Sequence, residues 1–363
     1  MEKIAHFCQV EIEQVIVVKD MPTIYQAPLL LEKQRVIPIL RDILALDKLT
    51  ISPTLLQKGH STWTQWKSLT SSDNRYHDKV TIALVGKYVQ FHDSYLSVLK
   101  SLEHSAMRCR RQLEIQWVDS EHLEAKTRAS DPAKFHKAWH DVCTASGILV
   151  PGGFGQRGTE GMVAAAKWAR ENKTPYLGIC LGMQIAVIEY ARNVCGLEGA
   201  TSEEFNGDAP HKLIMFMPEV DKQTMGATMR LGLRPTLFQE GSEWSRLRAL
   251  YAGKTEILER HRHRYEVNPA YISTLEDGGL SFVGKDEKAE RMEVIEIKDH
   301  PWFVAVQFHP EYLSRVLDPS RPYLGFIAAS AGLLGEITKD YAGVDGVVEG
   351  VNGVGINGES GLF

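Results

Sequence analysis

A cysteine between two glycines stands at a turn that suits a nucleophile. Cys180 follows the apolar run 175–179 and precedes the amphipathic run 183–190. This order predicts a strand, a sharp turn and a helix, with the thiol at the helix N-terminus, where the helix dipole favours the thiolate. A cysteine with this spacing alone is as often a small buried side chain as a nucleophile, so the prediction depends on partners elsewhere in the chain.

A histidine and a carboxylate further along the chain could be those partners. His309 comes just after the strand-like run 303–307, and Glu311 follows it, with Pro310 stiffening the step between them. In a triad of this kind the imidazole takes the thiol proton, while the carboxylate fixes the imidazole tautomer and stabilises the imidazolium. We therefore predict that Cys180, His309 and Glu311 are catalytic.

A glycine-rich turn before the cysteine could stabilise an oxyanion. The buried-strand run 147–150 leads into Pro151, Gly152, Gly153, Phe154 and Gly155. Backbone without side chains can aim N–H groups at a developing negative charge, and the residue after a nucleophile often supplies a second donor. The N–H groups of Gly153 and Leu181 are the predicted donors.

Alternating strand and helix patterns run from residue 80 to about 334. They predict an α/β fold with a doubly wound, mostly parallel sheet that is flavodoxin-like, and helices on both faces. Residues 292–297 and 303–307 extend this sheet, and the period-two alternation of 292–297 predicts a half-exposed strand. The other expected elements are 81–85, 95–107, 114–118, 147–150, 161–170, 176–179 and 181–192.

The two ends of the chain differ from this central region. Residues 1–75 contain a strand-like run at 15–18 and a helical pattern at 29–46, which we expect to be interrupted near Pro38. A polar linker at 65–79 marks a domain boundary. Beyond Gly335 the chain is glycine-rich, which predicts a disordered tail. The expected domains are therefore 1–75, an incomplete α/β segment with a linker, 76–335 and the tail 336–363.

Composition excludes several classes of protein. The chain is 44% hydrophobic and 24% charged, with a net charge of −5 and five scattered cysteines. These values argue against a nucleic-acid partner, a disulfide framework and a membrane protein, and they favour a cytoplasmic enzyme. The basic run 260–264 is interpreted as a solvated or anion-binding loop, and without further ligands His261 and His263 predict no metal site.

Three of these segments together resemble a known family. The stretches 151–155, 178–184 and 309–311, in this order, are similar to the glutaminase domain of class I (triad) glutamine amidotransferases. The resemblance covers residues 1 to about 335. The segments 93–95, 157–161, 228–232 and 259–266 narrow it to the CTP synthase family.

The resemblance implies a function. It indicates a Cys-His-Glu triad that releases ammonia from L-glutamine without a cofactor, for the ATP-dependent amination of UTP to CTP in pyrimidine nucleotide biosynthesis. ATP, UTP and Mg²⁺ are expected to be used by a synthetase domain of which only the last part resembles residues 1–75, and no phosphate-loop motif occurs. The expected partner is a full-length CTP synthase or a separate synthetase domain. Complete CTP synthesis by this chain alone is not expected, and we expect the chain alone to be monomeric or poorly soluble.

Substrate-binding residues carry over by position from the family. Glu204 matches the carboxylate that holds the glutamine α-amino group, and Arg264 matches a residue at the other end of the substrate. The remaining glutamine-binding residues are Gly153, Leu181, Gly182, Met183 and Gln184. Glu203 stands where the family usually has threonine, and we expect it to face away from Glu204 because neighbouring side chains on an extended segment alternate.

The region before Arg230 resembles a lid that responds to GTP as an activator. Here Ala227 replaces a glycine of the family, and an alanine at positive φ would cost on the order of 1 kcal/mol and misplace Arg230. This departure weakens the expectation of GTP activation. The alternative interpretation of Arg230 is a surface charge.

Two other functions stay open from the sequence. A cysteine peptidase or related hydrolase on the same fold would use a similar turn and histidine, although the segments around Glu204 and 260–264 speak against it. A catalytically silent regulatory or interaction fragment of CTP synthase is the second alternative. The intact set of Cys180, His309 and Glu311 argues against a silent fragment.

Overall fold

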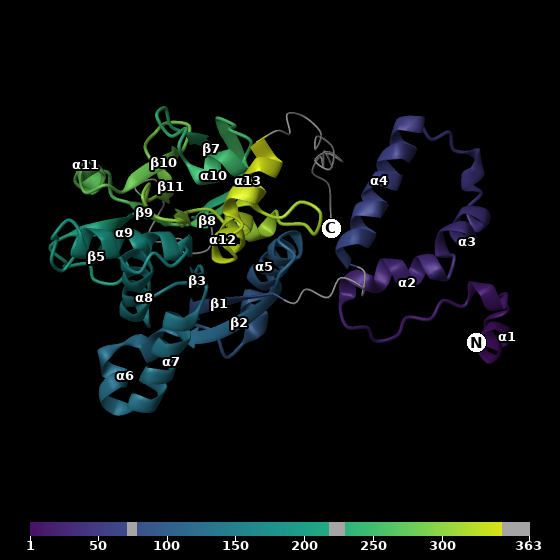
Figure 1. The fold of residues 1–363 in the computed structure, drawn as a ribbon, viewed down its shortest axis with the longest axis horizontal. Helices are drawn as coiled ribbons and strands as arrows, with labels where there is room; N and C mark the ends of the chain where they lie inside the picture. Colours follow the sequence, from purple (N-terminus) through teal and green to yellow (C-terminus); the bar gives the residue numbers. More distant parts are fainter. Residues whose placement is uncertain (71–77, 218–228, 343–363) are drawn as a thin grey trace, which may run out of the picture. The chain divides into compact units, whose positions relative to one another are not determined.

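The computed structural model describes residues 1–70, 78–217 and 229–342. The chain divides into two compact units, Met1–His77 and Asp78–Phe363, which are described separately (Figure 1). Ala227 and residues 343–363 of the predicted tail lie outside the described residues.

The first unit is helical. Its helices are α1 (Glu2–Cys8), α2 (Ala27–Lys33), α3 (Val36–Ile43) and α4 (Pro53–Thr70). Among its described residues only Ala5 and Thr70 are buried.

Two predictions for this unit are wrong. The run 15–18 is not a strand, because Val17 bonds through both its N–H and its carbonyl to the Gln34 side chain, each at 2.8 Å. The helical pattern breaks at Arg35, whose φ is 57°, and not at Pro38. Pro38 lies in the first turn of α3, where a helix leaves backbone N–H groups unpaired and tolerates proline.

A nine-stranded sheet forms the centre of the second unit (Figure 1). Its strand order is β2-β1-β3-β4-β12-β11-β10-β7-β8. Pairing is parallel from β2 to β12 and antiparallel from β12 to β8. The strands are β1 (Lys79–Gly86), β2 (Gln112–Asp119), β3 (Gly147–Val150), β4 (Tyr176–Ile179), β7 (Arg230–Phe238), β8 (Glu256–His263), β10 (Ser281–Lys285), β11 (Met292–Glu296) and β12 (Phe303–Val306).

Helices cover both faces of this sheet. One core cluster packs α8 (Thr159–Glu171) and α9 (Leu181–Asn193) on one face, and a second packs α5 (Leu96–Arg108) and α12 (Arg321–Ser330) on the other. The predicted doubly wound, mostly parallel α/β fold is confirmed. The remaining helices are α6 (Ala125–Ser130), α7 (Pro132–Thr144), α10 (Arg246–Leu250), α11 (Ile272–Asp277) and α13 (Leu334–Ala342).

A small second sheet joins distant segments of this unit. Its strands are β5 (Thr201–Ser202), β6 (Lys212–Phe216) and β9 (Tyr265–Val267), in the order β5-β6-β9. The sheet therefore fixes the segment after residue 202 and the segment before residue 265, where two predicted substrate ligands lie.

Strand β11 is buried along its whole length, so the half-exposed interpretation was wrong. Its two glutamates have buried partners. Glu293 bonds to Thr236 and Arg230, and Glu296 accepts from Ser245 Oγ at 2.7 Å. Such partners satisfy the carboxylates in the absence of water.

Two further segments differ from prediction. The basic run 260–264 belongs mostly to β8 and not to a loop, and its burial alternates so that His261 and His263 face inward. Residues 336–342 of the predicted tail belong to α13 (Leu334–Ala342), where Ile337 is buried and Leu334 and Tyr341 pack on the same core. The spacing of these three apolar residues places them along one face of a helix.

Within the described residues, no helix has both the length and the apolar character needed to cross a membrane.

Candidate active site

Cys180 occupies a strained turn at the carboxyl end of β4. Its backbone has φ 52° and ψ −99°, and it caps α9, which begins at the next residue. A non-glycine residue with positive φ is costly and persists only where its surroundings enforce it. Here the Cys180 N–H donates to the Val306 carbonyl of β12 at 2.7 Å. The predicted strand, turn and helix are thus present, with the thiol at the N-terminus of a helix.

His309 and Glu311 follow β12, the strand next to β4. The His309 Nδ1 atom lies 2.7 Å from Glu311 Oε1, and both side chains are largely buried. Burial by itself lowers the pKa of His309, but the negative charges of Glu311 and Cys180, together with hydrogen bonds to both, hold it well above its ordinary value. The structure therefore brings the three predicted triad residues together.

The glycine-rich turn lies beside the same residues, at the end of β3. A Cβ at Gly152 would lie 2.9 Å from His309 Cε1 and 3.6 Å from Cys180 Cβ, and one at Gly153 would lie 3.2 Å from Leu181 Cδ2. A side chain at Gly152 would therefore force the His309 ring to move, and one at Gly153 would press on Leu181. The two predicted oxyanion donors, Gly153 and Leu181, come from adjoining segments.

Parallel strands explain this convergence. Strands β3, β4 and β12 are neighbours and run in the same direction, so their carboxyl ends meet at one edge of the sheet. In open α/β sheets this edge is where ligands bind.

Two glutamines connect the nucleophile to β9. The Gln307 amide nitrogen donates to Cys180 Sγ at 3.5 Å, and the Gln184 amide nitrogen donates to Gln307 Oε1 and to the Tyr265 carbonyl, both at 3.2 Å. Gln184 was predicted for the pocket. Gln307 was missed, although its place at the end of the strand before His309 could have indicated it.

Glu204 and Glu203 have different partners, as expected from their adjacent positions. Glu204 Oε1 accepts from the Gly155 N–H at 2.8 Å, and Glu203 Oε2 accepts from the Phe216 N–H at 3.0 Å. Glu204 therefore reaches the glycine-rich turn, whereas Glu203 bonds to β6.

The other predicted pocket residues lie at the same end of the unit. The Arg264 guanidinium is 5.9 Å from the centre of the Phe154 ring, which belongs to the glycine-rich turn. Met183 is buried in the first turn of α9. Gly182 lies so close to β3 that a Cβ would come within 2.1 Å of the Val150 carbonyl oxygen.

This geometry agrees with a comparison against known families. The family model "Glutamine amidotransferase class-I" matches residues 90–329. The chain belongs to the class-I glutamine amidotransferase family. A second model, "CTP synthase N-terminus", matches residues 1–46.

Two relatives that are similar to this amidotransferase are CTP synthases. The CTP synthase of Neurospora crassa is 61% identical over 354 residues, 97% of this chain and 61% of the relative. That of Schizosaccharomyces pombe is 60% identical over 339 residues, 93% of this chain and 56% of the relative. The chain thus spans about three fifths of the length of the curated relatives it matches.

A solved structure matches a large part of this chain. The glutaminase domain of Trypanosoma brucei CTPS, with bound acivicin, is 42% identical to this amidotransferase and covers 70% of this chain and 94% of its own chain, with a TM-score of 0.64.

Arg230, the predicted lid residue, begins β7 of the amidotransferase and is not a surface charge. Its guanidinium pairs with the buried Glu293 carboxylate. Burial raises the pKa of Glu293, although Arg230 and Thr236 act against this shift. Arg230 is therefore held against β11 by a buried ion pair.

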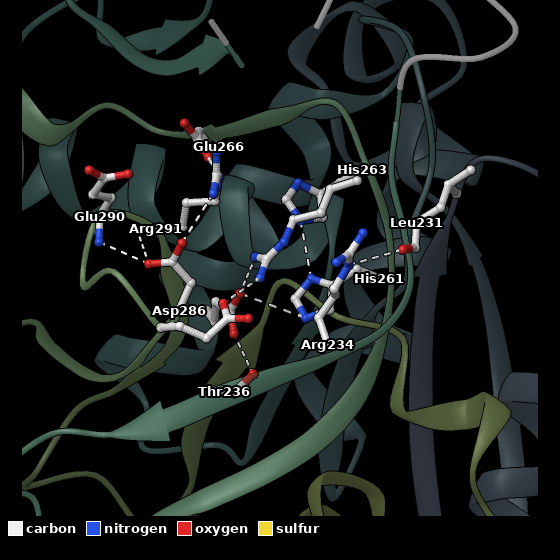
Figure 2. A network of polar contacts seen from close by, with 12 residues as sticks. Leu231, Arg234, Thr236, His261, His263, Glu266, Asp286, Glu290 and Arg291 are labelled. Carbon is white, nitrogen blue, oxygen red and sulfur yellow. Dashed lines mark hydrogen bonds and ion pairs between the residues drawn. The ribbon is translucent and has the colours of Figure 1, made fainter. Parts of the chain in front are cut away.

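The inward histidines of β8 lie beside this pair in a polar network that Figure 2 shows. His261 Nδ1 is 3.2 Å from His263 Nε2, and Arg291 contacts Asp286 at 3.1 Å and Glu266 at 2.9 Å. Burial, with nearby positive charges, lowers the pKa of His261 to about 2 and that of His263 to about 3. Both imidazoles are therefore neutral. Within the described ranges, no group of three or more His, Cys, Asp or Glu side chains is placed to hold a metal ion.

Sequence reasoning also missed Lys87, which follows β1. This lysine is only 3% exposed, and its amino group donates to the carbonyls of Phe154 and Gly155 in the glycine-rich turn. Burial lowers its pKa to about 8, and the nearby Glu204 carboxylate partly offsets this shift. A buried lysine away from a cofactor site gives little signal in a sequence.

Proposed function

We propose that this chain hydrolyses L-glutamine to glutamate and ammonia, with Cys180 as nucleophile, His309 as general acid and base, and Glu311 as the group that orients His309. The observation that carries the proposal is the strained Cys180 turn beside the 2.7 Å pair of His309 and Glu311. A nucleophile, a base and an orienting carboxylate in this order are the elements of covalent acyl transfer.

The first half-reaction forms a thioester. The raised pKa of His309 keeps it as an imidazolium beside the Cys180 thiolate. The thiolate attacks the side-chain amide carbon of glutamine, and the N–H groups of Gly153 and Leu181 stabilise the tetrahedral oxyanion. The imidazolium then gives its proton to the leaving amine, and ammonia departs.

The second half-reaction releases glutamate. His309, now neutral, takes a proton from water as the water attacks the thioester carbon, and the Cys180 thiolate leaves. Glu311 holds Nδ1 throughout, so that Nε2 faces the reacting groups.

The substrate is proposed to bind between the glycine-rich turn and the small sheet. Glu204 would pair with the α-ammonium group and Arg264 with the α-carboxylate, while Gly182, Met183 and Gln184 line the pocket. Support comes from the position of Glu204 against Gly155 and of Arg264 beside Phe154. The related trypanosomal domain with bound acivicin supports a ligand site in this domain.

The wider proposal is that the ammonia serves CTP synthesis. The relatives named CTP synthase and the match of residues 1–46 support it. In this proposal residues 1–75 are the last part of a synthetase domain, residues 76–335 form the glutaminase, and ATP, UTP and Mg²⁺ bind to synthetase parts supplied by a full-length CTP synthase or a separate domain. The proposed compartment is the cytoplasm.

GTP is proposed as an activator that acts near Arg230. The buried pair of Arg230 with Glu293 would have to open before the guanidinium could contact a nucleotide. GTP would therefore need a change at the start of β7 in order to act through this residue.

A glutamate-release assay tests the main proposal. Purified chain and a Cys180→Ala variant are compared with glutamine as substrate, with and without GTP, and the γ-glutamyl thioester on Cys180 is sought by acid quench and mass spectrometry. We expect release that the substitution abolishes. A folded wild-type chain that releases no glutamate and forms no thioester would contradict the proposal and favour a silent binding fragment; cleavage of peptides instead would favour the hydrolase alternative.

A further inference from the structure

The glycine-rich turn needs an anchor at its far end. Strand β3 fixes the turn at Val150, but Gly152 and Gly153 have no Cβ, and the backbone there can rotate widely. A side chain at either position would press on His309 or Leu181, so these two glycines leave the turn without stiffening side chains of its own. The direction of the Gly153 N–H therefore depends on what holds the residues after it.

One peptide unit after the glycines is held at both of its ends. The carbonyl oxygen of Phe154 accepts from Lys87 Nζ at 3.1 Å, and the N–H of Gly155 in the same peptide unit donates to Glu204 Oε1 at 2.8 Å. Lys87 also donates to the Gly155 carbonyl. The positive Lys87 thus bonds to carbonyl oxygens and the negative Glu204 bonds to the N–H. Each charge therefore faces the end of the peptide dipole that has the opposite sign.

The lysine also touches the oxyanion segment itself. Its Cδ and Cε atoms lie 3.6 Å and 3.7 Å from the point that a Cβ of Gly153 would occupy. The aliphatic stem therefore packs over Gly153, while the amino group bonds to the carbonyls of the next two residues. Long amphipathic side chains often combine these two roles.

Lys87 is itself rigidly held. Its N–H donates to the Tyr95 hydroxyl at 3.1 Å, and its carbonyl accepts from Arg157. The hydroxyl also accepts from the Tyr88 N–H at 3.2 Å. These contacts fix the backbone from which the lysine reaches the turn, so that the amino group enters as a preorganised support.

We propose that Lys87 is a positioning residue that, together with Glu204, clamps the Phe154–Gly155 peptide and so aims the Gly153 N–H at the oxyanion. Lys87 does not touch the reacting atoms. It acts through the backbone, and its effect belongs to the transition state, in which the oxyanion exists. The kinetic part of this inference rests on the proposed glutaminase activity.

Lys87→Met tests the clamp, because methionine keeps an apolar stem over Gly153 and removes the amino group. The matched control is Lys167→Met, which removes an exposed lysine of α8. We expect kcat for glutamine hydrolysis to fall by roughly 10²-fold, the effect of losing one oxyanion donor, with KM changed by less than about threefold. The control should stay within about twofold of wild type.

The rate of Cys180 alkylation distinguishes a role of Lys87 in the clamp from a general role in holding the structure. Iodoacetamide reacts with the Cys180 thiolate by displacement at carbon and forms no oxyanion, so its rate depends on the thiolate but not on Gly153. We expect Lys87→Met to leave this rate within about threefold of wild type. An unchanged kcat in the folded variant would overturn the inference, and so would a parallel loss of hydrolysis and alkylation.

Hydrogen exchange tests the clamp independently of activity. The Gly155 amide is protected by its bond to Glu204, and releasing the peptide should speed exchange over residues 151–155 by at least about tenfold in Lys87→Met but not in Lys167→Met. Unchanged exchange overturns the clamp even if the wild-type chain proves not to be a glutaminase. If Lys87→Met does not fold, Lys87→Gln, whose amide is too short to reach both carbonyls, takes its place with the same expectations.

Discussion

The amide nitrogen of Gln307 lies 3.5 Å from the sulfur of Cys180. Gln307 is fully buried at the end of β12, two residues before His309, and its oxygen accepts from Gln184. The accepted bond fixes which end of the amide faces the sulfur, so an N–H group points at the nucleophile. The Cys180 sulfur is therefore faced by a neutral hydrogen-bond donor, which would support the thiolate of the proposed mechanism.

Replacing Gln307 by leucine should slow the reactions of Cys180. A hydrogen bond to a charged group contributes about 1.5–3 kcal/mol, so we expect alkylation by iodoacetamide at pH 7 and glutamine hydrolysis each to fall by about tenfold or more. Stopped alkylation followed by mass spectrometry measures the first effect. Rates equal to those of wild type would show that the 3.5 Å contact does not support the thiolate.

A methyl group at Gly152 should disturb the site with little effect on the fold. The added Cβ would lie 2.9 Å from the His309 ring, and we expect Gly152→Ala to lower kcat/KM for glutamine by about 10²-fold because the ring must move. Gly207→Ala is the matched control, since nothing lies within 4 Å of its added Cβ. Equal activity of the two variants would contradict the close packing described here.

The charge of Glu311 should set the titration of His309. Removing it in Glu311→Gln should move the His309 pKa downward, because the carboxylate opposes the effect of burial. The C2-proton resonance of the ring, followed by NMR against pH, measures this shift. A titration unchanged by the substitution would mean that the pair does not form in solution.

The raised pKa of His309 also predicts how the stability of the fold changes with pH. Because the folded-state pKa of His309 is raised above its unfolded value of about 6.5, the stabilisation is fully present below that pH and is lost as the pH rises through the folded-state pKa. Urea unfolding should therefore show a difference between wild type and His309→Gln that narrows with rising pH. A difference that grows toward high pH would contradict this assignment.

Breaking the buried pair of Arg230 and Glu293 should destabilise the second unit. Arg230→Met leaves a carboxylate buried without its cation, which costs about 3–5 kcal/mol, whereas Arg230→Met combined with Glu293→Gln should recover part of this loss. The exposed pair of Lys137 with Asp141 provides the control, and Lys137→Met should cost less than about 1 kcal/mol. Urea denaturation measures the free energy of unfolding of all three variants. A similar loss for Arg230→Met and Lys137→Met would contradict the prediction.

The chemistry of the chain could be predicted from short segments. A cysteine between glycines, a glycine-rich turn and a histidine two residues before a glutamate each follow an apolar run, and parallel strands bring the ends of such runs to one edge. Local order along the chain therefore determined the parallel part of the sheet, the turn at Cys180 and the candidate triad.

Burial of polar groups could be decided only by the tertiary structure. The sequence does not show that β7, β8 and β11 lie in one sheet. In that sheet, Glu293 bonds to Arg230 and His261 contacts His263, so these side chains are buried and not solvent-facing. Lys87 and Glu204 meet one peptide unit from far apart in the chain. A sequence gives each residue its charge and local spacing, whereas the free energy of a buried polar group depends on its partner, and that partner is chosen by the packing of distant segments.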